Sequence, residues 1–135
     1  MELSSAMSFA AAGMKVQAAR LRVTAENLAN AESTAAAPGG EPYRRKTVSF
    51  ADHRDAASGL DLVDIDRYGT DRSDFELRHE PGHPAADPQG YVKYPNVNPL
   101  IELIDMRESQ CSYEANLNAL QLARSMIGHT LDLLR

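Results

Sequence analysis

The sequence is poor in aromatic residues: it has three Phe, five Tyr and no Trp among 135 residues. Alanine, leucine and methionine supply much of the apolar content, and all three are good helix formers. We therefore expect a largely helical core. The length suits one domain rather than two, and we expect a single elongated domain over residues 1–135.

Several other features are missing. Cys111 is the only cysteine, so no disulfide forms within the chain. No apolar run approaches the roughly 18 residues of a transmembrane helix, which predicts no direct membrane span. The opening residues, MELS, lack the basic start of a secretory signal peptide, and no long apolar core follows. We expect no cleavable signal of that kind.

Positive charge is scarce as well. The net charge is −5, whereas a nucleic-acid partner requires a clustered basic face. The one dense basic run is Arg44-Arg45-Lys46, which we interpret as a solvated loop or strand edge. We therefore predict no nucleic-acid partner.

The N-terminal segment, residues 3–30, predicts a long amphipathic helix. It has no proline and a single glycine, Gly13. Ser4 or Ser5 suits the N-cap position. Two apolar rows recur at seven-residue spacing, as in a coiled-coil seam, and alanines between them allow close approach of a partner helix. The rows are Met7, Met14, Leu21 and Leu28, and Phe9, Val16 and Val23.

The middle of the chain, residues 31–98, predicts a loop followed by a small β module. Its short runs alternate between apolar and polar residues and are bounded by Gly, Pro or Asp, which is typical of half-exposed strands. Asp87-Pro88-Gln89-Gly90 favours a tight turn. The expected strands lie at residues 47–50, 60–65, 75–77 and 91–94.

The C-terminal segment, residues 99–134, shows the clearest helical pattern. Asn98 suits the N-cap, and Pro99 falls at the first helical position, where its missing N–H costs nothing. The fold class is therefore mainly α with a small β module (α+β), in which long terminal helices pair coiled-coil-like around a loop-rich β insertion. The apolar rows are Met106, Tyr113, Leu120, Ile127 and Leu134, and Leu103, Leu117 and Leu131.

The predicted helices are too long for a compact globule. At 1.5 Å per residue the second would measure roughly 52 Å, whereas a compact domain of this size is about 37 Å across. Two helices alone cannot bury apolar stripes of this width. We expect apolar surface to remain for another molecule.

A zinc-protease pattern, H-E-x-x-H, occurs as His79-Glu80-Pro81-Gly82-His83. It requires both histidines on one regular helix. Pro81 disrupts such a helix at a cost of roughly 3 kcal/mol, and no third ligand follows at the usual spacing. Cys111 lies mid-helix and is better explained as a small packing group. We therefore predict no metal, no cofactor and no catalytic residues, with metallohydrolase as the weakest alternative.

Three motifs resemble the flagellar basal-body rod protein family. Residues 25–31, AENLANA, are similar to a signature that rod and hook proteins share near the N-terminus. Residues 81–84 and 90–99, PGHP and GYVKYPNVNP, resemble a run typical of one proximal-rod subfamily. Residues 112–116 and 123–126, SYEAN and ARSM, resemble the pattern of its C-terminal helix.

The resemblance implies a structural subunit of the rod, the axial drive shaft that joins motor to hook. Its implied partners are other rod subunits, further copies of itself, and proteins of the basal body and export apparatus. It also implies type III export without a cleavable signal, and assembly in the periplasm. A cytoplasmic helical adaptor or an export chaperone is the alternative.

Two sets of residues follow from the helices and the resemblance. The first set is an expected assembly interface. The alternative role for its residues is to pair the two helices within one chain or, for the asparagines, to cap a helix of their own chain. The expected assembly interface comprises Phe9, Val16, Val23, Asn27, Asn30, Met106, Tyr113, Leu120, Ile127 and Leu134. The structural signature comprises Pro81, Gly82, His83, Pro84, Gly90, Tyr91, Tyr94, Pro95, Asn96, Asn98 and Pro99.

Overall fold

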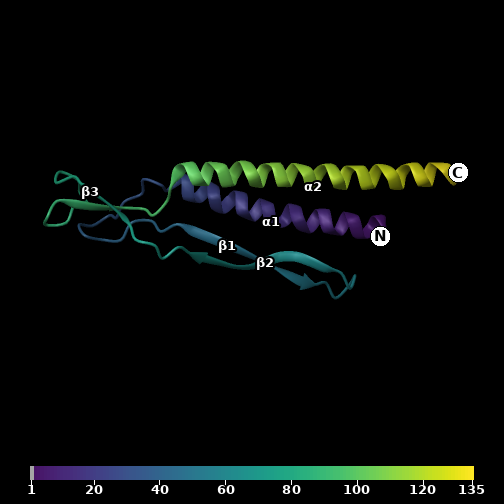
Figure 1. The fold of residues 1–135 in the computed structure, drawn as a ribbon, viewed down its shortest axis with the longest axis horizontal. Coiled ribbons are helices and arrows are strands. Elements are labelled where there is room, and N and C mark those ends of the chain that lie inside the picture. The colour runs from purple at the N-terminus through teal and green to yellow at the C-terminus, as the bar shows by residue number, and fades with distance from the viewer. Residues whose placement is uncertain (1) are drawn as a thin grey trace. The chain divides into compact units, whose positions relative to one another are not determined.

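The structure is a computed structural model that describes residues 2–135. Along the sequence, a long helix at each end flanks two β hairpins (Figure 1). This arrangement confirms the predicted α+β fold class. The elements are α1 (Leu3–Ala29), β1 (Lys46–Arg54), β2 (Asp61–Thr70), β3 (Glu76–His79), β4 (Tyr91–Tyr94) and α2 (Pro99–Leu133).

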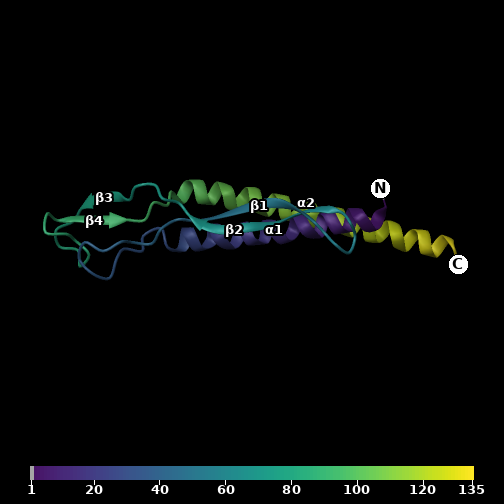
Figure 2. The same cartoon turned by 90° about the horizontal axis from the view of Figure 1, so that it is seen from below.

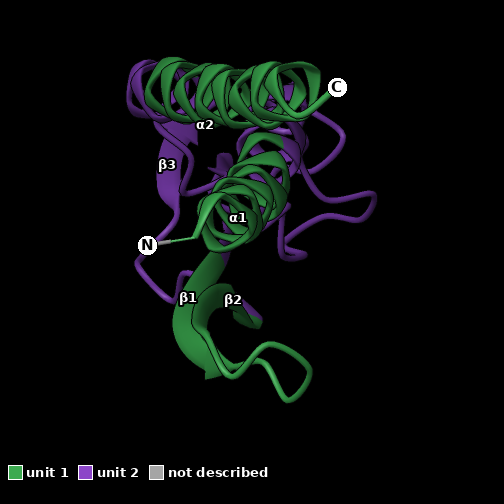
Figure 3. Cartoon of the chain, turned by 90° about the vertical axis from the view of Figure 1, so that its right-hand side faces the viewer, with its two compact units in different colours: residues 1–21, 48–67, 107–135 green, residues 22–47, 68–106 purple. Residues whose placement is uncertain are grey.

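The residues group into two compact units, coloured separately in Figure 3. Unit 1 contains α1 up to Leu21, Val48–Arg67 and the chain from Arg107 on. Unit 2 contains Arg22–Thr47 and Tyr68–Met106. Both helices and the first hairpin contribute residues to both units, so no single linker separates them. The single domain expected from the sequence stays a prediction.

Helix α1 begins earlier than its serines suggested. The amide of Ala6 donates to the carbonyl of Glu2 at 3.2 Å, which closes the first turn. Ser4 lies inside that turn, and its carbonyl accepts a bond from the hydroxyl of Ser8 at 3.2 Å. The expected N-cap at Ser4 or Ser5 is therefore wrong, because both residues are already helical.

Helix α2 begins where the sequence predicted. The side-chain oxygen of Asn98 accepts a bond from the amide of Leu100 at 3.1 Å, and its carbonyl accepts the amide of Glu102 at 3.1 Å. Pro99 occupies the first helical position. Asn98 is thus confirmed as the N-cap. Neither helix among residues 2–135 has the length and apolarity that crossing a bilayer requires.

The strands form two separate two-stranded sheets, β1–β2 and β3–β4. The β3–β4 pair is antiparallel and lies side by side in Figure 2, with Glu76 opposite Tyr94 and His79 opposite Tyr91. All four expected strands are present, although β1 and β2 continue to Arg54 and Thr70. The inner face of β3–β4 carries the small core of unit 2, which includes Val92 and Tyr94.

The turn before β4 is the one that the sequence predicted. The amide of Gly90 donates to the carbonyl of Asp87 at 2.9 Å. The Asp87 carboxylate accepts the amides of Gln89 and Tyr91 at 3.0 and 2.9 Å. Gly90 has a φ of +87°, and a Cβ there would lie 3.1 Å from both His79 Nε2 and a side-chain carbon of Pro81. This position requires glycine for both conformation and space.

We expect Gly90→Ala to lower the free energy of unfolding by about 1–3 kcal/mol, because it combines backbone strain with a steric clash. Gly82→Ala is the matched control, since nothing lies within 4 Å of its added Cβ. Urea unfolding followed by circular dichroism compares the two variants. Equal midpoints would show that the turn tolerates a side chain.

Candidate functional site

The residues of α2 that are buried within the chain are small or polar. Glu102 and Ser109 are completely buried and Ala123 is 5% exposed, and these positions recur at seven-residue spacing. Asn116 belongs to the same row. Within unit 1 it packs so closely on α1 that a Cβ on Gly13 would lie 2.7 Å from its side-chain nitrogen. The seven-residue repeat was predicted, but the fully buried row does not consist of the predicted apolar residues.

The predicted apolar row of α2 lies beside this buried row. Met106, Tyr113, Leu120 and Ile127 are half-buried, and Leu134 is 79% exposed. Many other large apolar side chains of α2 are exposed, which confirms that apolar surface remains. They are Leu100, Ile101, Leu103, Ile104, Leu122, Met126, Leu131 and Leu133.

The predicted interface residues of α1 divide into two groups. Val16 and Val23 are only 3% and 5% exposed, so they pack within the chain. Phe9, by contrast, is 40% exposed. We therefore leave both valines out of the assembly surface and retain Phe9.

Asn27 lies at the centre of a buried polar junction in unit 2. Its side-chain oxygen accepts bonds from the hydroxyl of Tyr43 and the amide of Lys46, both at 2.8 Å. Its side-chain nitrogen donates to the carbonyl of Lys46 at 2.9 Å and to Glu102 Oε2 at 3.2 Å. With 1% exposure, Asn27 joins α1 to β1 and α2 and presents no polar group to a neighbour.

Arg45 completes the junction. Its Nε donates to Glu102 Oε1. Its guanidinium lies 3.9 Å from Asp71 and 3.7 Å from Asp105. The amide of Arg45 donates to the side-chain oxygen of Asn96 at 2.8 Å. A buried carboxylate is thus matched by a cation and an amide, as burial of charge requires.

The solvated basic run predicted from the sequence is wrong for two of its three members. Arg45 neutralises a buried carboxylate, and Arg44 lies over the ring of Phe75 at 4.2 Å. Only Lys46 is exposed, where it pairs with Glu26 at 2.8 Å. Sequence analysis also missed Glu102, although an acid in the first turn after Pro99 was a usable signal.

Asn30 has a simpler role than Asn27. Its side-chain nitrogen donates to the carbonyl of Glu26 at 2.9 Å, and its side-chain oxygen accepts the hydroxyl of Ser33 at 3.1 Å. Asn30 therefore closes the C-terminal end of α1 within its own chain. This is the capping role that the sequence left as an alternative.

The pKa of the Tyr43 phenol is raised above its ordinary value of 10.0, mainly by burial; Lys46 opposes this, and Glu26 and Glu102 add to it. Folding therefore favours the neutral phenol. Its contribution to stability is fully present below pH 10.0 and is lost as the pH rises from there through the folded pKa.

We expect Tyr43→Phe to be about 1 kcal/mol less stable than the parent at pH 8, because it loses a bond to Asn27. The deficit should shrink at pH 11, where only the parent carries this ionising phenol. Urea midpoints at both pH values measure it. A deficit that grows with pH would contradict the prediction.

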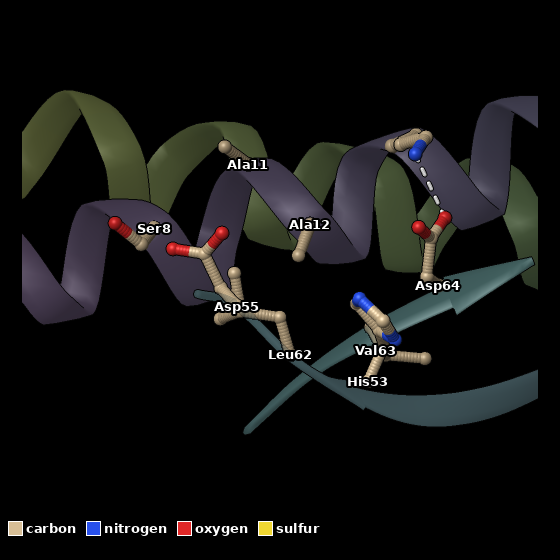
Figure 4. Close-up of a pocket in the computed structure, with 9 residues that line it drawn as sticks. Ser8, Ala11, Ala12, His53, Asp55, Leu62, Val63 and Asp64 are labelled. Carbon is tan, nitrogen blue, oxygen red and sulfur yellow. Dashed lines mark hydrogen bonds and ion pairs between the residues drawn. The ribbon is translucent and has the colours of Figure 1, made fainter. Parts of the chain in front are cut away.

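Unit 1 has a groove where the first hairpin packs on α1 (Figure 4). Leu62 and His53 of the hairpin lie near Ala12, and Lys15 bonds to the Asp64 carboxylate at 2.7 Å. The groove has a volume of about 410 Å³ and is mostly apolar. Within residues 2–135, no group of three or more His, Cys, Asp or Glu suits a metal ion.

Known proteins match nearly the whole chain. Residues 89–133 match the family described as flagellar basal body rod FlgEFG protein C-terminal. The chain is 50% identical to the flagellar basal-body rod protein FlgC of Agrobacterium fabrum, over 98% of this chain and 96% of that protein. The FlgC proteins of Escherichia coli O6:H1 and Bacillus subtilis are 38% and 34% identical, each over at least 94% of both chains.

The chain belongs to the FlgC family of flagellar basal-body rod proteins. The predicted function as a structural rod subunit is thereby confirmed, and the adaptor or chaperone alternative finds no support. The relatives in this family are structural proteins. Membership also places the chain in the flagellar basal body.

The signature predicted for this FlgC family member has a buried and an exposed part. Gly90, Tyr94 and Pro95 are buried, and Asn98 and Pro99 start α2. The side-chain nitrogen of Asn96 donates to the carbonyls of Asp71 and Ser73 at 3.0 and 3.2 Å. The remaining members lie at the surface or half-buried: Pro81, Gly82, His83, Pro84 and Tyr91.

The zinc-like pentapeptide of this FlgC relative lies in a hairpin connection. His79 ends β3 and stacks edge-on against Tyr91 at 5.0 Å. The side-chain Nδ1 of His83 accepts the amide of Ala85 at 3.0 Å. The segment is therefore a turn rather than a helix, as its prolines indicated.

Proposed function

We propose that this rod subunit assembles through the exposed apolar surface of α2, together with Phe9 of α1, against other rod subunits and copies of itself. The supporting observation is that α2 buries polar residues and exposes apolar ones. Glu102 and Ser109 are buried, whereas large apolar side chains such as Leu122 are exposed. Burial of one such side chain contributes roughly 1.5–3 kcal/mol. Folding leaves that free energy for assembly.

We also propose a route and a location for the subunit. The subunit is exported through the flagellar type III apparatus and joins the periplasmic part of the basal body. It contacts basal-body and export-apparatus proteins, needs no nucleic acid, and catalyses no reaction. Membership of the FlgC family supports this proposal.

Complementation tests the function directly. An epitope-tagged chain is expressed in cells that lack their own FlgC protein, and swimming and basal-body composition are measured. We expect motility to return and the tag to co-purify with basal bodies. A tag found only in the soluble cytoplasmic fraction, in swimming cells, would overturn the proposal.

The same surface predicts weak local stability before assembly. Ser109 and Ala123 are the buried residues of α2 from Arg107 on, so few contacts protect this part of the helix. In the purified chain we expect its amides to exchange at least about tenfold faster than those of the buried segment around Val92, a difference of about 1.4 kcal/mol in opening free energy. Equal protection in a non-associating monomer would contradict this prediction.

A further inference from the structure

The side chain of His83 closes the connection between β3 and β4. Its Nδ1 accepts a hydrogen bond from the amide of Ala85 at 3.0 Å. Pro84 lies between the two residues and has no N–H, so Ala85 carries the first amide after His83 that can donate. A backbone amide only donates, so the ring nitrogen that faces it must carry no proton. This hydrogen bond therefore requires the neutral imidazole.

Ala85 connects this turn to the small core of unit 2. It is only 4% exposed and packs with Val92 and Tyr94 of β4. Its carbonyl accepts the amide of Gly39 at 3.3 Å, and Ala35 packs against the same core. The bond from His83 thus fixes the residue that joins the β3–β4 hairpin to the segment between α1 and β1.

We propose that His83 is an acid-sensitive switch whose protonation breaks its bond to Ala85 and loosens the contact between Ala85 and Gly39. A charged histidine donates from both ring nitrogens, so one N–H would face another and the buried amide of Ala85 would lose its acceptor. Histidine is the side chain that ordinarily gains its charge between pH 8 and pH 5. The β3–β4 ladder does not use this bond, so we expect the opening to be local.

The charged groups around the turn leave the hydrogen bond as the deciding contact. The ring of His83 lies 6.4 Å from the ring of Tyr94. On that tyrosine, Glu80 accepts the hydroxyl at 3.1 Å and the Arg78 guanidinium covers the ring at 4.0 Å, so charges of both signs are present. The Asp87 carboxylate is bonded to the amides of the following turn.

Amide hydrogen exchange of the purified full chain, followed by NMR at pH 7.5 and pH 5.0, tests the switch. We expect the protection factors of Ala85 and Gly39, corrected for intrinsic exchange, to fall about tenfold in acid, the effect of one lost hydrogen bond. The amide of Val92 in the β3–β4 ladder is the internal reference and should keep its protection. Unchanged protection of Ala85 in the parent chain overturns the proposal.

His83→Asn is the decisive variant. Its side-chain oxygen is attached to Cγ, as Nδ1 is in histidine, and asparagine commonly accepts the amide two residues further on in such turns. It keeps the acceptor but cannot gain a charge, so Ala85 should stay protected at both pH values. An equal loss in the parent and in His83→Asn would show that acid acts elsewhere.

Two further variants separate the bond from other effects of acid. His83→Leu lacks an acceptor, so Ala85 should be weakly protected at both pH values. His79→Asn removes the histidine that stacks on Tyr91 and should leave the response to acid unchanged. A His79→Asn chain that no longer responds would assign the switch to the wrong histidine. If His83→Leu does not fold, the parent and His83→Asn still decide, and either result leaves the proposed rod function untouched.

Discussion

Replacing Arg45 with methionine should remove about 3–5 kcal/mol from the free energy of unfolding, the cost of leaving a buried carboxylate without its cation. Glu102 is completely buried, and Arg45 is its one cationic partner among the described contacts. Because small domains are stable by only about 5–15 kcal/mol, this change removes a large part of the total. Urea unfolding of the purified chain measures it.

Lys46→Met is the matched control, because Lys46 is the next cation along the chain and pairs with Glu26 at the surface, where an ion pair contributes little to stability. A double variant with methionine at both 45 and 102 should recover part of the loss, since apolar residues of similar volume often replace buried ion pairs without penalty. Equal costs for the two single variants would show that Arg45 does not neutralise Glu102.

Leu122→Asp should abolish swimming while leaving the chain folded and abundant. Leu122 is 64% exposed in the free subunit, so an aspartate there is solvated and costs the fold little. In the rod it would replace a buried leucine with a charge, and loss of about 3 kcal/mol weakens each contact roughly 100-fold. Swimming speed, chain abundance and basal-body incorporation are measured together.

Gln121→Asp carries the same charge one residue away on another side of the helix, so it should swim normally. If both variants swim, the exposed α2 surface is not an assembly surface. If Leu122→Asp fails to accumulate, its circular dichroism after purification decides whether folding rather than assembly was lost. A folded chain that is incorporated normally would contradict the prediction.

The start of α2, the four strands and the turn before β4 could be predicted from the sequence because local chemistry determines them. Asn98 before Pro99, and Asp87 three residues before Gly90, are cap and turn patterns with one dominant solution. The polar junction could not be predicted in this way. Asn27, Arg45 and Glu102 are distant in the chain, and only tertiary contact turns a surface-type arginine into a buried partner.

The repeat of α2 was predictable, but the choice of which row faces inward was not. Several rows share seven-residue spacing, and the apolar ones were the natural choice for burial. The structure instead buries a row of small or polar residues, because Gly13 lets Asn116 pack closely on α1 and the junction satisfies Glu102.

The polar row has a mechanical consequence. An apolar helix–helix interface permits neighbouring helices to shift in register at little cost in free energy, because after the shift one leucine occupies the place of another. Here, a shift of α2 by one turn, about 5.4 Å, would separate Glu102 from both Asn27 and Arg45 and leave an unpaired carboxylate buried in the protein. When torque acts on the rod, these buried polar contacts oppose sliding between the two helices. Each subunit can then transmit torque without a change in its helix register.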